Sequence, residues 1–238
     1  MRRIVVLSAL VIFGLAIAIF YLFRRKPSES PGPQSPSEAA AGKEVEAFIR
    51  EKVVEGFFDR DTIVQYAVEI AEDENASTSL VERIPQMVDE ALESHSRDQA
   101  RWPSVTDCDR LDRAFQELEQ RGIVARQNFA CCQTCGNSEI GEPIAEARKK
   151  GPVKGYVYYH EQDTERAGSG QELYLASGSV GGTEEDALAV ANTIVEKLEN
   201  QGLTVRWEGK LDKRIIVELD WKRRRSRAGE AWRRRGDH

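Results

Sequence analysis

The sequence has few residues of the types that crosslink chains or bind metals: 4 cysteines, 3 histidines and 2 methionines among 238 residues. Four cysteines are too few for a disulfide-stabilised secreted scaffold. Hydrophobic residues make up 40% of the chain and charged residues 31%, which excludes a collagen-like or fully disordered protein. There is only one long apolar run, so a multi-span membrane protein is also excluded. At about 150 residues per domain, the length allows one or two domains.

Negative charge is absent from residues 1–26 and scarce in residues 222–238, where Glu230 and Asp237 are the acidic residues. The net charge of −6 combines +5 in residues 1–26, −17 in residues 27–221 and +6 in residues 222–238. The chain is therefore basic at both ends and acidic in the middle. Because binding to phosphates requires positive charge, we expect no nucleic acid on the acidic body.

The single apolar run extends from Ile4 to Phe23 without a charged residue. As a helix it would span roughly 30 Å, the thickness of the hydrocarbon layer of a bilayer. A cleaved signal peptide is the alternative, but it has a shorter apolar core and a small-residue cleavage site, whereas this run ends directly at Arg24, Arg25 and Lys26. Residues 1–26 are therefore predicted to be an uncleaved, single-pass membrane anchor.

The side of the membrane on which the body lies is predicted from two weaker signals. The basic residues that flank the run slightly favour a cytoplasmic C-terminal side. Three closely spaced cysteines that have no obvious disulfide partners are typical of a reducing compartment. We therefore expect a membrane-localised protein with a cytoplasmic body.

Four segments follow the anchor. Residues 27–42 contain half of the prolines and are predicted to be an extended linker. Residues 43–101 show apolar residues at helical spacing and are predicted to be a small helical region. Residues 102–222 alternate between strand and helix patterns, with a capping-box helix start at Thr106, and are predicted to form an α/β domain. Residues 223–238 are predicted to be a basic, disordered tail.

The predicted fold class is α+β. The order of elements in residues 102–222 suggests a mixed β-sheet with helices packed on one face. Its expected strands are 123–129, 153–162, 173–176, 203–207 and 215–221, the last two forming a hairpin. Its expected helices are 106–121, 143–150 and 183–198.

Within this region, several short motifs together resemble the signature of an uncharacterised bacterial family of domains of unknown function. The motifs are Trp102-Pro103, Thr106 to Leu111, Gly122-Ile123, Ala125 to Phe129, Cys131 to Gly136, Gly155-Tyr156, His160, Gln162 to Glu165, and Leu219 to Trp221. The resemblance covers about residues 43–224 and implies a single fold unit. It implies no activity, and the anchor and linker are departures from the soluble proteins of that family.

The cysteine motif, Cys131-Cys132-Gln133-Thr134-Cys135, follows a predicted strand and allows three interpretations. The thiols are inert, or they bind zinc, or they act in redox or nucleophilic chemistry. The candidate zinc ligands are Cys131, Cys132, Cys135, Cys108 and His160. The candidates for thiol chemistry are Cys132 and Cys135, with His160 as a weak candidate base. A single C-x-x-C pair is a weak zinc signal, and Cys108 lies on an apolar helical stripe, where a buried thiol is common.

A hydrolytic site is an alternative with less support from the sequence. His160 with Asp163 or Glu165 could orient a base beside a cysteine nucleophile. If the strand continued past His160, however, residues three apart would point to opposite faces, so a simple strand end with a turn is the better interpretation. The glycine-rich segment 178–183 precedes a helix, but it lacks the lysine of a phosphate-binding loop and acidic residues follow it.

The basic C-terminal residues, 222–235, allow contact with anionic lipid if the body is cytoplasmic. Nucleic acid, a solubilising role, or an intramolecular contact with the acidic helices are the alternatives. Taken together, the sequence predicts a membrane-anchored, non-enzymatic binding or regulatory module, with zinc as the candidate cofactor and a protein as a candidate partner. A thiol-dependent enzyme is the alternative function.

Overall fold

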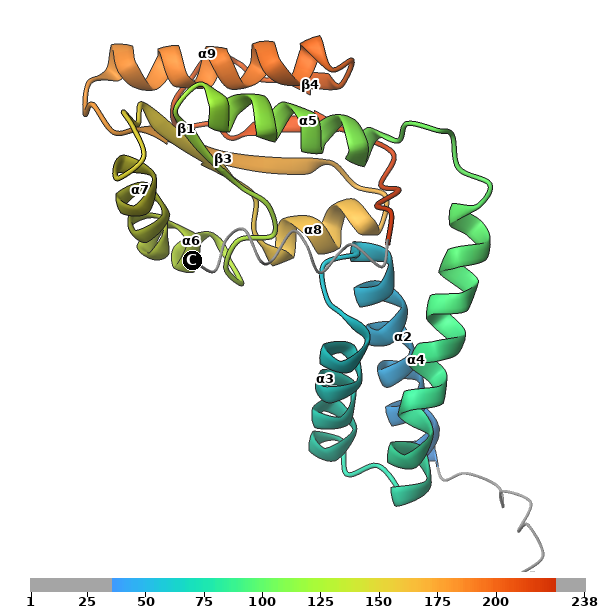
Figure 1. Ribbon diagram of the computed structural model, residues 1–238. Helices are drawn as coiled ribbons and strands as arrows, with labels where there is room; N and C mark the ends of the chain where they lie inside the picture. The colour runs from blue at the N-terminus through green and yellow to red at the C-terminus, as the bar shows by residue number, and fades with distance from the viewer. Residues whose placement is uncertain (1–35, 226–238) are drawn as a thin grey trace, which may run out of the picture. The chain divides into compact units, whose positions relative to one another are not determined.

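The computed structural model describes residues 36–225 (Figure 1). The predicted anchor from Ile4 to Phe23, most of the predicted linker, and residues 226–238 of the predicted tail lie outside the described residues. Within residues 36–225, no helix combines the length and the apolar character needed to cross a bilayer. From Ala41 onward the chain forms one compact unit, which holds both the helical region and the sheet.

The predicted helical region consists of α2 (Pro36–Glu55), α3 (Arg60–Asp73) and α4 (Thr78–Gln99). Of the two cap candidates in the sequence, Asp59 and Asp61, Asp59 is the N-cap of α3, and its side chain accepts a hydrogen bond from the Thr62 N–H at 2.8 Å. The apolar stripes of the three helices bury one another in a common core, formed by Val45, Ile49, Val53, Ile63, Ala67, Ala71, Ile84 and Val88.

Helix α2 begins inside the segment that was predicted to be an extended linker. Pro36 is tolerated there because the first residue of a helix needs no N–H donor. Three alanines follow from Ala39 to Ala41, and alanine has the highest helix propensity. Ala41 is already buried, so the helix contributes to the core from this point.

The sheet contains β1 (Ile123–Arg126), β2 (Gly155–Tyr158), β3 (Leu173–Ser179), β4 (Thr204–Arg206) and β5 (Ile215–Glu218). The spatial order is β1-β2-β3-β5-β4. Strands β1 and β2 are parallel, and all other neighbours are antiparallel, including the predicted β4–β5 hairpin. The predicted α+β class with a mixed sheet is therefore confirmed.

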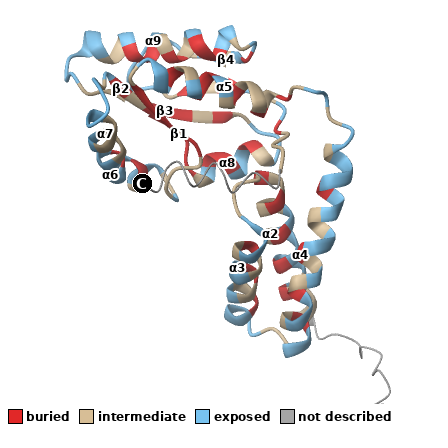
Figure 2. Cartoon of the chain, viewed as in Figure 1, coloured by how far each residue is buried: buried red, intermediate tan, exposed pale blue. Residues whose placement is uncertain are grey.

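The prediction that helices cover only one face of the sheet is wrong. Helices α5 (Asp107–Gln120) and α9 (Glu184–Asn200) pack on one face, and α6 (Gln133–Glu139) and α7 (Gly141–Arg148) lie on the other (Figure 1). The reason is visible in β1, where Ile123 and Ala125 join the main core while Val124 between them joins a second core with Tyr158 and Ile140. A strand that is buried on both faces needs packed helices on both. Figure 2 shows by colour that most residues of β1 and β2 are buried.

The strand predicted over residues 153–162 is shorter than expected. Strand β2 ends at Tyr158. An additional helix, α8 (Glu161–Gly168), begins directly after His160. His160 is the N-cap of α8, and Asp163 occupies the third helical position, where its side chain accepts a hydrogen bond from the His160 N–H. This reciprocal pattern is a capping box with an unusual cap residue, histidine, and it starts a helix where the sequence suggested continued strand.

The predicted basic tail begins too early. Arg223, Arg224 and Arg225 belong to the folded body. Arg223 pairs with Asp112 at 2.9 Å, and Arg225 donates to the backbone carbonyls of the helical region, including that of Val53 at 3.1 Å. These arginines are therefore intramolecular contacts that join the helical region to the sheet, and only the basic residues after 225 remain as a predicted lipid-binding segment.

Candidate metal centre

The cysteine motif forms a tight turn between the end of β1 and the start of α6. Asn128 and Ala130 both have positive φ angles, 50° and 59°, which reverse the chain direction. For alanine this conformation costs roughly 1–2 kcal/mol, so the surrounding contacts must hold it in place. Two such contacts are backbone hydrogen bonds to the parallel neighbour, Phe129 N–H to the Tyr159 carbonyl (2.8 Å) and Glu161 N–H to the Ala130 carbonyl (3.1 Å).

This turn brings three thiols together. The sulfurs of Cys131, Cys132 and Cys135 all lie within 4.8 Å of one another, and the Cys131 thiol donates to the Cys135 Sγ at 3.3 Å. Cys132 is the N-cap of α6, but its side chain makes no capping hydrogen bond. Cys131 is exposed and the other two are partly exposed. The cluster could hold a metal ion.

The charge state of the cluster is shared among its sulfurs. The backbone N–H and the thiol of Cys135 lower the pKa of Cys132, with a further contribution from the Cys131 thiol. The side chains of Cys131 and then of Cys132 raise the pKa of Cys135 to about 12. Without a metal, the Cys132 thiol therefore ionises more readily than the Cys135 thiol, and the neighbouring thiols stabilise its thiolate. A divalent cation would replace those protons and bring the remaining sulfurs into the thiolate form.

Helix α6 is fixed to the sheet by Tyr158. Its hydroxyl lies within hydrogen-bond distance of Asn137 Oδ1 (2.5 Å) and of the Gln133 carbonyl oxygen (3.2 Å). Burial is the main cause that raises the pKa of Tyr158 to about 12, so it remains a donor at neutral pH. Gly136, the residue after Cys135, lies directly against the ring, where a Cβ atom would be 2.5 Å from Tyr158 Cε2. The cysteine turn therefore rests on a rigid aromatic support.

Two of the five predicted metal ligands do not join this cluster. Cys108 is 1% exposed on α5, within the main core, and burial raises its pKa to about 12. It is the buried small hydrophobe that its position on an apolar stripe suggested. His160 also lies outside the group of ligand atoms that the described residues bring together.

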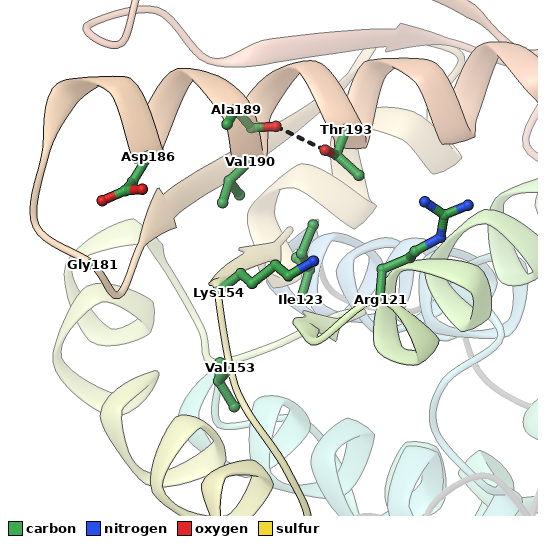
Figure 3. A pocket seen from close by; sticks show the side chains of 9 residues that line it. All are labelled: Arg121, Ile123, Val153, Lys154, Gly181, Asp186, Ala189, Val190 and Thr193. Atoms are coloured by element: carbon green, nitrogen blue, oxygen red, sulfur yellow. Dashed lines mark hydrogen bonds between the residues drawn. The ribbon is translucent and has the colours of Figure 1, made fainter.

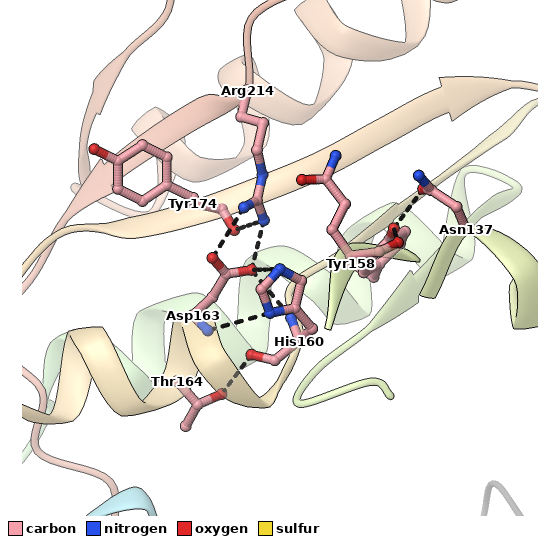
Figure 4. Close-up of polar contacts among 8 residues, drawn as sticks. Asn137, Tyr158, His160, Asp163, Thr164, Tyr174 and Arg214 are labelled. Carbon is pink, nitrogen blue, oxygen red and sulfur yellow. Dashed lines mark hydrogen bonds and ion pairs between the residues drawn. The ribbon is translucent and has the colours of Figure 1, made fainter. Parts of the chain in front are cut away.

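His160 instead forms a buried network with Asp163 and Arg214 (Figure 4). Its Nδ1 accepts from the Asp163 N–H at 3.3 Å, and its Nε2 lies 3.1 Å from Asp163 Oδ2. Arg214 donates to both carboxylate oxygens of Asp163 and to the Tyr174 carbonyl. Burial lowers the pKa of His160. The network provides hydrogen bonds and an ion pair to the Asp163 carboxylate, which is only 2% exposed. A buried charge is stable only when it has such partners.

This geometry bears on the hydrolytic hypothesis. His160 and Asp163 meet because the strand ends before them, as in the preferred interpretation of a strand end with a turn, and the helical turn brings residues three apart together. Both ring nitrogens of His160, however, face Asp163 and not a cysteine. The H-x-x-D spacing was visible in the sequence, whereas nothing in it marked Arg214, the residue before β5, as the partner of Asp163.

A separate pocket lies at the other end of β1 and β2. It has a volume of about 310 Å³, and Figure 3 shows Lys154 extending below α9 toward Arg121. Ile123 and Val190 contribute apolar surface, and Asp186 lies beside Gly181 at the far side. Because parallel strands point the same way, the cysteine turn at their carboxyl ends and this pocket at their amino ends are distinct sites.

The glycine-rich segment 178–183 leads from the end of β3 into α9. Thr183 caps α9, and its hydroxyl oxygen accepts from the Asp186 N–H at 3.0 Å. Asp186 stands against Gly181, where a Cβ would meet its carboxylate. An acidic side chain in this place disfavours a phosphate group.

Comparison with known protein families decides the relationship that the motifs suggested. A family model described as a domain of unknown function, DUF6891, matches residues 38–225. The chain belongs to this family. The match covers both the helical region and the sheet, so the DUF6891 domain includes all of the compact unit that is described here from Ala41. Comparisons with curated proteins and with solved structures gave no match.

Proposed function

We propose that this DUF6891 protein is a membrane-anchored, non-enzymatic binding module that holds a zinc ion through Cys131, Cys132 and Cys135. The observation that carries the metal site is the convergence of three sulfurs within 4.8 Å. Sulfurs bound to one tetrahedral zinc at about 2.3 Å lie about 3.8 Å apart. The Cys131–Cys135 separation of 3.3 Å is close to that value, so small side-chain rotations suffice to bind the ion.

The donor type supports zinc in preference to a hard cation. Thiolates are soft ligands that select zinc or Cu(I), whereas Mg²⁺ and Ca²⁺ require oxygen donors. The described residues bring no carboxylate into the cluster. The rigid Tyr158 support described above also suits a site that must hold three sulfurs in fixed positions.

The test is the metal content of the purified full-length chain. We expect about one zinc ion per chain, and we expect Cys131→Ser, Cys132→Ser and Cys135→Ser each to lose it, because three ligands are the minimum for a tight protein site. Cys108→Ala is the matched control and should keep its zinc. A wild-type chain that binds no zinc at low-micromolar metal would disprove the proposal.

A thiol-dependent enzyme is the second candidate, and the lowered pKa of Cys132 favours it. A thiolate is the reactive form of cysteine in both redox and nucleophilic catalysis. Alkylation with iodoacetamide distinguishes the two functions. In the metal module, Cys132 reacts slowly until a chelator removes the zinc. In the enzyme, Cys132 reacts fast in the untreated protein, and the chelator changes nothing.

The anchor is supported by the charge-free run from Ile4 to Phe23 and by the basic residues that follow it. The proposal places the domain on the cytoplasmic side. Membrane fractionation of the full-length chain should recover it with the bilayer after carbonate washing, and a chain that lacks residues 1–26 should be released. Protection of the cysteines from an impermeant maleimide in intact cells would support the cytoplasmic side, whereas labelling would contradict it.

A further inference from the structure

The number of ligands in the cysteine cluster sets a limit on what the metal can do. A structural zinc site is closed by four protein ligands, whereas a site with three protein ligands keeps one position open. Among the described residues, the group of ligand atoms contains only the sulfurs of Cys131, Cys132 and Cys135. The two further candidates from the sequence, Cys108 and His160, are committed elsewhere.

These two commitments are strong. Cys108 is 1% exposed on α5, packed among Leu111 and Phe115 of the main core, so it cannot reach the turn without unfolding the helix from the sheet. His160 is 5% exposed, caps α8 and directs both ring nitrogens at Asp163. Moving it to a metal would leave a buried carboxylate short of partners, which carries a large energetic penalty.

The open side of the cluster faces solvent. Cys131 is exposed, and Cys132 and Cys135 are partly exposed. The buried side of the turn is occupied by the Tyr158 ring, which lies against Gly136. A ligand can therefore approach the metal from outside, whereas the Tyr158 ring occupies the inner side of the turn among the described residues.

We infer that the metal in this cluster keeps its fourth coordination position open to solvent and exchanges water there for a small thiol. This inference rests on the proposed function. A thiol fits because a metal already held by soft sulfur donors favours another soft donor, and because the exposed face imposes no size limit. Binding forms one metal–sulfur bond, releases one water molecule and transfers the thiol proton to solvent.

The experiment uses Co²⁺, which replaces zinc in tetrahedral sites and reports its ligands by visible absorption, in the full-length chain. With Co²⁺ alone we expect a sulfur-to-cobalt charge-transfer band. Adding 2-mercaptoethanol should shift the visible ligand-field bands and raise the charge-transfer intensity by about one third, because three Co–S bonds become four. Ethylene glycol, which lacks sulfur, is the matched additive and should change nothing.

The outcomes separate the two proposals. If Co²⁺ gives no charge-transfer band, both the metal site and the open position are disproved. If the band appears but does not respond to the thiol, only the open position is disproved. The variant His238→Ala then identifies the cause: a response that appears only in this variant shows that the imidazole of His238 closes the site. A Co²⁺-dependent increase to twice the mass on size-exclusion chromatography would show instead that a second copy supplies the fourth ligand, which also overturns the inference.

Discussion

Two turns at the carboxyl ends of the parallel strands β1 and β2 use similar backbone positions but different side-chain chemistry. The first follows β1 and starts α6 at Cys132, and the second follows β2 and starts α8 at His160. At the second turn the cap is complete, because His160 and Asp163 satisfy each other and Arg214 neutralises the carboxylate. At the first turn the N-cap side chain makes no capping hydrogen bond, and its sulfur lies near two other sulfurs.

The difference separates a structural site from a candidate functional site. The side chains of His160 and Asp163 are buried and hydrogen-bonded to internal partners, so they stabilise the fold. The side chains of the cysteine turn are accessible and add little to the fold, although they lie on a strained backbone with a rigid support. Local strain without a local stabilising side chain is typical of a site that is kept for binding.

The largest effect should come from breaking the His160 turn at its centre. Asp163→Ala removes the carboxylate that caps α8 and leaves Arg214, which is only 23% exposed, without its charge partner. Removing one member of a buried ion pair costs about 3–5 kcal/mol of unfolding free energy. Urea denaturation measures this loss. The matched control is Glu218→Ala, which breaks an exposed pair with Arg206 and should cost less than about 1 kcal/mol. Equal losses in both variants would contradict the structural role of the network.

The next effect concerns the support under the cysteine turn. Gly136→Ala places a methyl group 2.5 Å from Tyr158 Cε2, so α6 must move away from the sheet. Overpacking costs about 1–3 kcal/mol, and the higher helix propensity of alanine offsets up to about 1 kcal/mol of this. Zinc affinity should fall together with stability, because Cys135 moves with its neighbour. Gly141→Ala in α7, where a Cβ meets nothing within 4 Å, is the control and should keep both properties.

The sequence predicts the residues of the cysteine turn better than those of the His160 turn. The three cysteines of the cluster were identifiable because they are four residues apart at most, and a turn after a strand brings such neighbours together. The helix caps at Asp59, Thr106 and Thr183 were also predictable, since each depends on contacts within one turn of helix.

Features that depend on distant partners were not predictable. Arg214 and Asp163 are 51 residues apart, and only the folded sheet brings them together. The same is true of Arg223, which looked like part of a charged tail but pairs with Asp112 across 111 residues. The second layer of helices was missed because a strand of four residues, Ile123 to Arg126, is too short for its periodicity to reveal burial on both faces.

A smaller effect tests the cap residue alone. His160→Ala removes the side chain that accepts the Asp163 N–H and should cost about 1 kcal/mol, with zinc content unchanged. His160→Asn, which supplies another capping acceptor, should recover most of this loss.

Because burial lowers the pKa of His160, the folded protein resists its protonation, so this residue's contribution to stability is present above pH 6.5 and is lost as the pH falls below it. The alanine variant should therefore lose less stability than wild type between pH 7 and pH 5. A fall in zinc content in His160→Ala would place this residue at the metal after all.

The smallest effect on folding, and the sharpest contrast with Asp163, should come from the cysteines. Replacing Cys131, Cys132 and Cys135 together by serine removes three side chains that are at least partly exposed and that stabilise no helix cap. In the presence of a chelator, the triple variant should match wild-type unfolding free energy within about 0.5 kcal/mol, as exposed substitutions do. With zinc present, only the wild type should gain stability, by an amount that grows with the logarithm of free zinc concentration. If the triple variant is strongly destabilised without metal, the cysteine turn is a structural element like the His160 turn. If instead both proteins gain equally from zinc, the ion binds elsewhere and the two turns do not differ in the way that their side chains indicate.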